Sequence, residues 1–146
     1  MDKDATFIFK YNLMDAWFED YYELKIYDKD TDNVVIFDYN TDDEDVVNRV
    51  YTLSKNGIDA IKNLFTDNLL SLNGSDIEFP LVLDGCTNRF CIRGSRYNEF
   101  EAYNLWAWEG KDKPHPKADM VIKMFNNIKY ILNAEKIDTT HFELDI

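Results

Sequence analysis

An alternation of apolar and polar residues at period two, repeated in consecutive segments, is the feature that most constrains what this chain can fold into. Apolar or aromatic side chains occupy every second position in residues 7–13, 22–26 and 35–39. Strands with one buried face show this period. Turn formers (DKDTDN, then NTDDED) follow the second and third segments. Strand, polar turn and strand in succession predict antiparallel hairpins, with a further strand at 46–53.

The second half of the chain adds more strand patterns. DIEFPLVLDG is strand-like, although Pro80 cannot donate to a ladder and indicates an edge or a bulge. CTNRFCIRG and NEFEAYNLWAWEG predict two further strands, the last with Trp106 and Trp108 on one face. We expect both tryptophans to lie in the core or to be semi-buried against a helix; if exposed, they would mark a partner site. A short strand pattern ends the chain at 142–146.

Two helical stripes accompany these strands. Ser54 is placed as an N-cap, and Leu53 and Ile58 have the spacing of a hydrophobic staple. Apolar residues then recur at helical spacing up to Leu72. A second stripe follows Pro116, a residue that suits the first turn of a helix.

These patterns together predict an α+β fold. We expect an antiparallel sheet of about six or seven strands with two amphipathic helices, about 54–72 and 116–134. A chain of 146 residues without a linker or internal repeat predicts a single domain, 1–146. No run of 18 apolar residues occurs, so no membrane-spanning helix is expected.

The formal net charge of −12 narrows the class of partner. Residues 1–60 carry 15 acidic and 6 basic residues, whereas residues 61–146 carry 13 and 10. Contacts to phosphate come from Lys and Arg, so direct binding of nucleic acid is disfavoured. An acidic face can instead steer a basic protein toward it. The alternative is that the acidity serves only solubility.

The Asp-rich turns raise the question of a calcium site. An EF-hand loop requires Gly at its sixth position and Glu at its twelfth. Counted from Asp28, these positions hold Asn33 and Tyr39. Counted from Asp38, the twelfth position holds Arg49, which would repel a cation. We expect turns in which Asp and Asn bond their own backbone, and no metal.

The acidic cluster around the second turn is the candidate docking surface. Carboxylates there could bind Lys and Arg of another protein, and a neighbouring tyrosine could supply an apolar anchor. The alternative is a well-solvated turn. The predicted partner-binding residues are Asp38, Tyr39, Asp42, Asp43, Glu44 and Asp45.

Catalytic signatures are missing from the sequence. His115 lies between two prolines and His141 lies in the tail, and neither belongs to a ligand array such as HExxH. No GxSxG, Gly-rich phosphate loop or Walker lysine motif occurs. Cys86 and Cys91 are expected to be reduced, partly buried side chains. We therefore expect no enzymatic activity and no cofactor; a deep pocket with a cysteine near a histidine would revive an enzyme.

One stretch, NRFCIRGSRYN, is locally basic. On a strand, Arg89 and Arg93 point the same way, and Arg96 follows them. We expect these side chains to pair with the abundant acids of the chain. A small anion site is the alternative.

The layout of the chain resembles that of small bacterial proteins, some of which are similar to immunity proteins of polymorphic toxin systems. The resemblance lies in the Ser-capped helix at 54–72, LDG at 83–85, the Asn at 104 and the Pro-led last helix. These motifs are short, and the resemblance assigns no functional residue.

The expected function is that of an acidic, non-enzymatic binding protein that inhibits a basic protein target such as a nuclease. An immunity protein and a phage-encoded inhibitor of a defence nuclease are two versions of it. The alternative is a structural or assembly subunit whose acidity serves only solubility. The segment MDKDATFIFKYN lacks the pattern of a secretory signal, so the expected compartment is the cytoplasm of a bacterium or an infected host cell.

Overall fold

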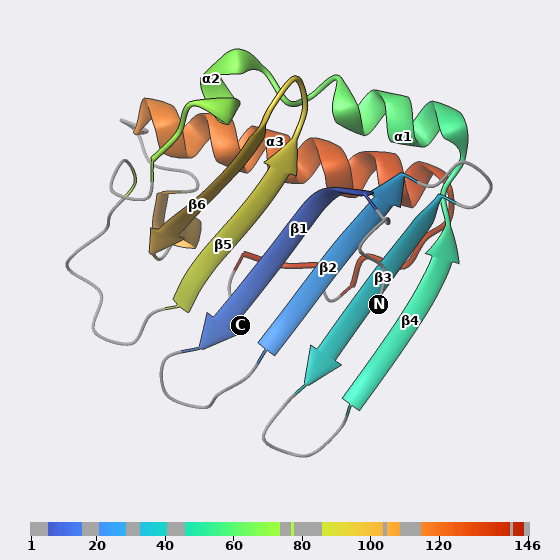
Figure 1. Ribbon diagram of the computed structural model, residues 1–146. Coiled ribbons are helices and arrows are strands. Elements are labelled where there is room, and N and C mark those ends of the chain that lie inside the picture. Colours follow the sequence, from blue (N-terminus) through green and yellow to red (C-terminus); the bar gives the residue numbers. More distant parts are fainter. Residues whose placement is uncertain are drawn as a thin grey trace.

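The computed structural model describes residues 6–15, 21–28, 33–40, 46–73, 77, 86–103, 105–108, 115–140 and 142–144. Six strands form one antiparallel sheet in the order β4-β3-β2-β1-β5-β6 (Figure 1). The strands are β1 (Thr6–Asp15), β2 (Tyr21–Asp28), β3 (Val34–Asn40), β4 (Val46–Thr52), β5 (Cys86–Arg93) and β6 (Tyr97–Tyr103). The helices are α1 (Lys55–Lys62), α2 (Asp67–Leu70) and α3 (Pro116–Ala134), with a short 3-10 helix, η1 (Leu105–Trp108). The predicted α+β fold with an antiparallel sheet is confirmed.

The register of the sheet follows from the predicted hairpins. β1 to β4 form a meander, and β5 and β6 form a hairpin that joins the other side of β1. Tyr11 of β1 is therefore in register with Leu24 of β2 and with Phe90 of β5. Because side chains alternate between the two faces of a strand, register partners share a face.

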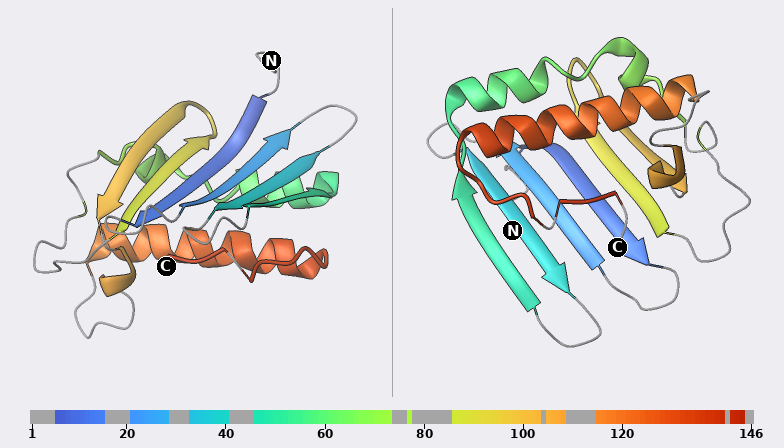
Figure 2. Two further views of the ribbon diagram at one scale, coloured as in Figure 1. Left: turned by 90° about the horizontal axis from the view of Figure 1, so that it is seen from below. Right: turned by 180° about the vertical axis from the view of Figure 1, so that it is seen from behind.

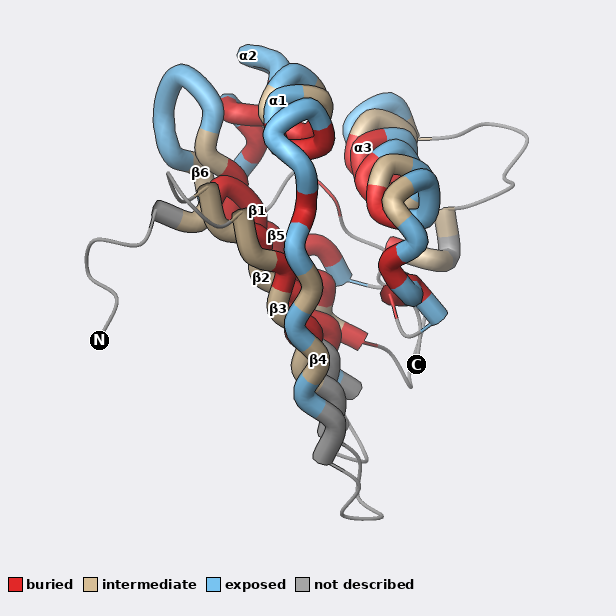
Figure 3. The backbone as a smooth tube through the Cα atoms, turned by 90° about the vertical axis from the view of Figure 1, so that its right-hand side faces the viewer, coloured by how far each residue is buried: buried red, intermediate tan, exposed pale blue. Residues whose placement is uncertain are grey.

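All three α-helices lie on one face of the sheet, and the segment after α3 crosses the same face (Figure 2). The strands and the helices that cover them both carry buried residues (Figure 3), and the buried hydrophobic side chains form one core cluster. The aromatic ring of Phe9 stacks on Phe65 with centroids 6.2 Å apart, and Tyr11 meets Phe125 edge-on at 5.1 Å. Each fully buried aromatic or aliphatic side chain stabilises the fold by about 1.5–3 kcal/mol.

The single helix predicted at about 54–72 is instead two helices, α1 and α2. Ser54 caps α1 as expected, because its hydroxyl accepts a hydrogen bond from the Gly57 amide at 3.0 Å. After the break, the Thr66 hydroxyl accepts from the Leu69 amide at 3.4 Å and caps α2. A Thr that bonds the backbone in this way favours a new helix start over a helix interior. The apolar stripe continues through the buried Phe65, which hides the break in the sequence.

Helix α3 matches the predicted helix at 116–134 residue for residue. Pro116 occupies its first turn, where a missing amide costs nothing. The Nδ1 atom of His115 accepts from the amides of Lys117 and Ala118 at 3.2 and 3.3 Å, so this histidine is the N-cap. Within the described ranges, no helix has the length and apolar character needed to cross a membrane.

The strand predicted through Trp106 and Trp108 ends earlier. β6 stops at Tyr103, and the two tryptophans belong to η1. Both are half-buried and pack against the core, in agreement with the expected burial. The amide of Leu105 donates to Oδ1 of Asn88 at 3.0 Å, which holds η1 under the end of the sheet.

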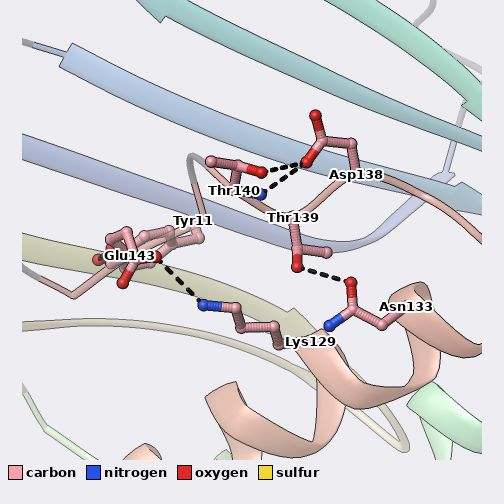
Figure 4. Close-up of polar contacts among 7 residues, drawn as sticks. All are labelled: Tyr11, Lys129, Asn133, Asp138, Thr139, Thr140 and Glu143. Carbon is pink, nitrogen blue, oxygen red and sulfur yellow. Dashed lines mark hydrogen bonds and ion pairs between the residues drawn. The ribbon is translucent and has the colours of Figure 1, made fainter.

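The end of the chain, predicted as a strand at 142–146, is not a strand over its described residues 142–144. Phe142 stacks on Phe125 of α3 with ring centroids 4.1 Å apart. Lys129 of α3 pairs with Glu143 at 3.2 Å (Figure 4). Thr139 donates to Asn133 at 2.8 Å, which holds the turn after α3 against the helix. Side-chain contacts to α3 and the sheet thus fix this segment without a ladder of backbone bonds.

One buried amide joins three parts of the chain. Asn88, fully buried on the helix side of β5, donates to the Tyr11 hydroxyl at 2.9 Å and to the Leu144 carbonyl at 3.0 Å. Its oxygen accepts from Leu105. The Tyr11 hydroxyl donates in turn to the Glu143 carbonyl at 2.7 Å. A buried polar group with all its partners satisfied fixes one arrangement of the core.

Candidate functional site

The sheet has a second face on which no described helix lies (Figure 3). We call it the open face; it carries Lys10, Asn12 and Met14 of β1 and their register partners on the other strands. The helix layer takes the alternate residues, such as Tyr11 and Leu13. Any partner that binds the sheet directly must therefore contact the open face or one of the edges of the sheet.

A row of polar side chains crosses all six strands of the open face. Its members hydrogen-bond in pairs between adjacent strands. The amide of Asn12 donates to Glu23 at 2.7 Å, and Arg89 donates to Glu101 through Nε at 2.9 Å and Nη2 at 2.6 Å. The amide of Asn48 donates to the Asp38 carboxylate. The row, in register order, is Asn48, Asp38, Glu23, Asn12, Arg89 and Glu101.

Glu23 in this row is buried, with 7% of its surface exposed. Lys25 lies 2.7 Å from one of its oxygens and Lys10 lies 3.8 Å from the other. The hydrogen bond that Lys25 donates to Glu23 raises the pKa of Lys25 above its ordinary value. The carboxylate is thus balanced by two cations within the sheet and adds no surplus negative charge to the open face.

Aromatic rings and an arginine occupy one end of the open face. The Arg93 guanidinium lies 5.0 Å from the Tyr97 ring centroid and 5.7 Å from that of Phe7. The Phe7 ring also meets Tyr27 edge-on at 6.4 Å. Burial, followed by the hydrogen bond with Cys91, raises the pKa of Tyr97. These contacts make this end of the face rigid and well packed.

Exposed apolar side chains are concentrated on the open face. Among the described residues, five large hydrophobic side chains are exposed, and four of them belong to this face. Their exposed fractions are 37% for Met14, 60% for Val50, 42% for Tyr97 and 45% for Tyr103; the fifth, Tyr130, lies on α3. Tyrosine and methionine on an exposed face are typical of protein interfaces.

Three acidic segments of the chain are attached to strand ends at one end of the sheet. β1, β3 and β6 end there, and β2, β4 and β5 begin there. Segments 16–20 and 41–45 each join two of these strand ends, and 78–85 leads directly into β5. Their sequences, AWFED, TDDED and EFPLVLDG, contain eight Asp and Glu residues and no Lys or Arg. We call these strand ends and the three segments attached to them the acidic end.

Net charge differs sharply between the residues that the structure describes, which we call the framework, and the remaining residues. The residues that the structure describes include twelve Asp and Glu and twelve Lys and Arg, a formal net charge of zero. The remaining residues include sixteen acids and four bases and account for the whole charge of −12. Many framework acids are paired within the fold, for example Asp28 with Lys62 at 3.0 Å and Asp138 with Arg49 at 2.7 Å.

The predicted partner-binding residues fall into two groups. Asp38 lies in the polar row of the open face, bonded to Asn48. Tyr39 belongs to β3, in register with Tyr22 and Val47, and its side chain is outside the described residues. The remaining four, also outside the described residues, are Asp42, Asp43, Glu44 and Asp45.

In the locally basic stretch, Arg89 pairs with Glu101 as expected, whereas Arg93 donates to the Phe7 carbonyl at 3.2 Å. Arg96 donates to the Ser71 hydroxyl at 2.6 Å and lies 3.9 Å from Asp67. Cys86 and Cys91, which β5 places on opposite faces, are both buried and form no disulfide. Burial raises the pKa of Cys91. In the described part of the chain, no three His, Cys, Asp or Glu side chains are grouped to hold a metal ion.

Sequence reasoning missed Met14 and Tyr103, which lie in one row of the open face at the acidic end, on either side of their shared register partner Thr87. The period-two pattern assigns each to a face of its own strand. Nothing local brings the two strands together, because β1 and β6 are far apart in the sequence. Only the sheet order places them in one row.

A hollow in the helix layer is a weaker candidate. Two adjoining cavities of about 290 and 410 Å³ lie between α2 and α3 and share Pro116 and Met120. Of the charged residues that line them, Asp119 and Lys123 pair with each other at 3.0 Å, and Lys117 lines the second cavity. The hollow therefore offers mainly apolar surface.

No protein-family model matches this chain, and no curated protein is similar to it in sequence. Its function therefore has to be inferred from the open face and the acidic end themselves.

Proposed function

We propose that this protein is an acidic, non-enzymatic binding protein that inhibits a basic protein target. The observation that carries the proposal is the distribution of charge. The framework is neutral, and three segments with eight carboxylates and no compensating Lys or Arg are attached to strand ends at one end of the sheet. A rigid neutral body with its surplus charge attached at one end presents a directed negative potential to a partner.

In this mechanism, charge accelerates the association of the two proteins, and apolar contacts stabilise the complex. Carboxylates at 41–45 take the place of phosphates in the basic groove of the target, and their field raises the association rate. Met14 and Tyr103, exposed beside the acidic end, supply the dry centre of the contact. The inhibited target then cannot admit its own anionic substrate.

A nuclease is the target class that fits this mechanism best, since its substrate is itself a polyanion. An immunity protein and a phage-encoded inhibitor of a defence nuclease both satisfy it. Such a protein acts in the cytoplasm of a bacterium or an infected cell. Cys86 and Cys91 are buried and form no disulfide, which is consistent with a reducing compartment.

A structural or assembly subunit is the second candidate, favoured by the uncovered face and by the two edge strands, β4 and β6. The two candidates differ in salt dependence. Binding driven by the acidic end weakens strongly between low and high salt, whereas an apolar assembly contact does not.

The test compares two variants of equal net charge. The end variant carries Asp42→Asn, Asp43→Asn, Glu44→Gln and Asp45→Asn. The framework control carries Asp59→Asn, Asp67→Asn, Asn56→Lys and Asn126→Lys, all at exposed positions on the helices. Both variants change the net charge by the same four units.

Wild type and both variants are immobilised and exposed to bacterial cytoplasmic extract at low and high salt. We expect wild type and the framework control to retain a basic nuclease whose activity the free protein suppresses at equimolar ratio. The end variant is expected not to retain this nuclease. Equal retention by both variants would remove the acidic end from the proposal.

A further inference from the structure

Strand β6 is an edge of the described sheet with an unusual outward pattern. Alternate residues of YNEFEAY place Tyr97, Glu99, Glu101 and Tyr103 on the open face. The intervening Phe100 and Ala102 are buried on the helix side. One side of an edge strand leaves its backbone N–H and C=O groups free to pair with another chain. β6 therefore offers a backbone ladder beside a short line of tyrosines and carboxylates.

The geometry of this line is symmetric. The Tyr97 hydroxyl donates to Glu99 at 3.2 Å, and the Tyr103 hydroxyl donates to Glu101 at 3.1 Å. An open hollow of about 490 Å³ lies along the strand, lined by Glu99, Phe100, Glu101 and Tyr103. The side chains at the edge are thus ordered by their own contacts before any partner arrives.

The two carboxylates differ in what balances them. Arg89 on β5 pairs with Glu101 at 2.6 Å. The residue opposite Glu99 on β5 is Cys91, which carries no positive charge. Among the described residues, Glu99 makes no ion pair. Glu99 is therefore the stronger attractor for an added cation, with Glu101 beside it.

A second copy of this chain is a poor occupant of the edge. In an antiparallel pairing of two β6 strands centred on Phe100, Glu99 of each copy would face Glu101 of the other. Like charges directly opposite in a sheet are destabilising. The same two positions suit lysine or arginine on an incoming strand, because opposite charges in cross-strand pairs are favourable.

We infer that the β6 edge binds an extended basic segment of the partner protein, which adds to the sheet as a seventh strand. The segment carries Lys or Arg two residues apart, so that both cations lie over Glu99 and Glu101. Backbone bonds supply affinity, and alternate side chains supply selectivity. The rings of Tyr97 and Tyr103 flank the cations. The inference rests on the proposed function only in taking the partner to be basic.

The test uses a synthetic extended peptide with two lysines separated by one valine, flanked by valine and threonine. One control peptide has the same composition with the lysines adjacent, so that they point to opposite faces of a strand. A second control has the first sequence with N-methylated backbone amides. Binding to the intact protein is followed by titration of the β6 backbone amide resonances.

We expect the alternating peptide to shift the β6 amides and to bind more tightly than both control peptides. Glu99→Gln should weaken binding of the alternating peptide about two- to fivefold, which corresponds to the loss of one exposed charge pair. The matched substitution Asp59→Asn, on α1, should leave binding unchanged. Equal binding of all three peptides, or resonance shifts confined to other strands, would overturn the inference.

The end variant separates this inference from the proposed function. If β6 binds the segment but the acidic end has no role, the alternating peptide binds the end variant and wild type equally. If the acidic end alone is responsible, Glu99→Gln has no effect and the end variant loses the peptide. That second result would contradict the inference about β6 but would agree with the proposed function.

Discussion

The carboxylate of Glu23 lies 2.7 Å from the ammonium nitrogen of Lys25, on the face of the sheet that no described helix covers. Lys10, the register partner of Lys25 on β1, lies on the other side of the same carboxylate. An open sheet face in a chain of net charge −12 could have been strongly anionic. Instead Lys10 and Lys25 compensate the two charges that its polar row leaves over, and the segments at the acidic end carry eight of the twelve surplus charges.

Glu23→Ala is expected to lower the free energy of unfolding by about 1–3 kcal/mol, because it leaves two facing lysines and the Asn12 amide without their acceptor. Urea denaturation measures the change. Glu99→Ala, an exposed carboxylate on the same face, should stay within about 0.5 kcal/mol of wild type. A loss for Glu23→Ala no larger than that of the control would show that the buried pair does not stabilise the sheet.

Asn88→Ala should lower the free energy of unfolding by about 2–4 kcal/mol, because it removes the hydrogen-bond partner of the Leu105 amide and of the Leu144 carbonyl in the core. The C-terminal segment is expected to lose hydrogen-exchange protection before the rest of the fold. Tyr11→Phe, which removes only the hydroxyl that reaches the Glu143 carbonyl, should cost less. Uniform loss of protection across the sheet in Asn88→Ala would contradict the local role of this amide.

We expect Gly57→Ala to destabilise the protein, although replacing a helical glycine by alanine usually stabilises a helix. In most helices the change stabilises by about 1 kcal/mol. Here the added methyl would clash with the Glu135 carboxylate and would lie 2.9 Å from the side chain of buried Leu53. That carboxylate also bonds the backbone amide and hydroxyl of Ser54. We expect a net loss of about 1–2 kcal/mol in thermal or urea unfolding.

A Glu135→Ala background provides the control for Gly57, because it removes the nearer obstacle. The loss caused by Gly57→Ala should shrink there. If Gly57→Ala stabilises the wild-type protein, the close contact between α1 and the end of α3 is not as described.

Stability should decline with pH above about 9, in part because of Cys91. Burial raises the pKa of this thiol above its ordinary value of 9.0, so the unfolded chain loses the proton at a lower pH than the folded chain does. Raising the pH through this window therefore favours the unfolded state. Urea unfolding at a series of pH values should show a smaller decline in Cys91→Ala than in wild type. Identical declines would exclude a contribution from this thiol.

Much of the fold follows from local patterns, and the exceptions have identifiable causes. The hairpins and α3 are predictable because their apolar periods are unbroken. The break between α1 and α2 is hidden because Phe65 continues the stripe through it. η1 resembles a strand because NLWAW alternates, although Leu105 is held by a side chain from another strand. Such a tertiary contact leaves no local trace.

The candidate site was predictable in charge but not in shape. The cluster at 42–45 stands out in the sequence, and Asp38 proves to be part of a hydrogen-bonded row rather than a free carboxylate. Both Val35 and Ile36 of β3 are apolar, so the pattern does not tell which face the helices cover. The open face, with Met14 and Tyr103 in one row on either side of Thr87, emerges only from the sheet order.

Titration with a lysine homopeptide tests most directly whether surplus charge at one end of a neutral framework attracts a cationic partner. The peptide is added to wild type, the end variant and the framework control at low salt, and affinity is followed by calorimetry. We predict that the end variant binds at least about fivefold more weakly than the framework control, although both have the same net charge. Equal weakening of the two variants would mean that only total charge matters, and it would contradict a directed acidic end.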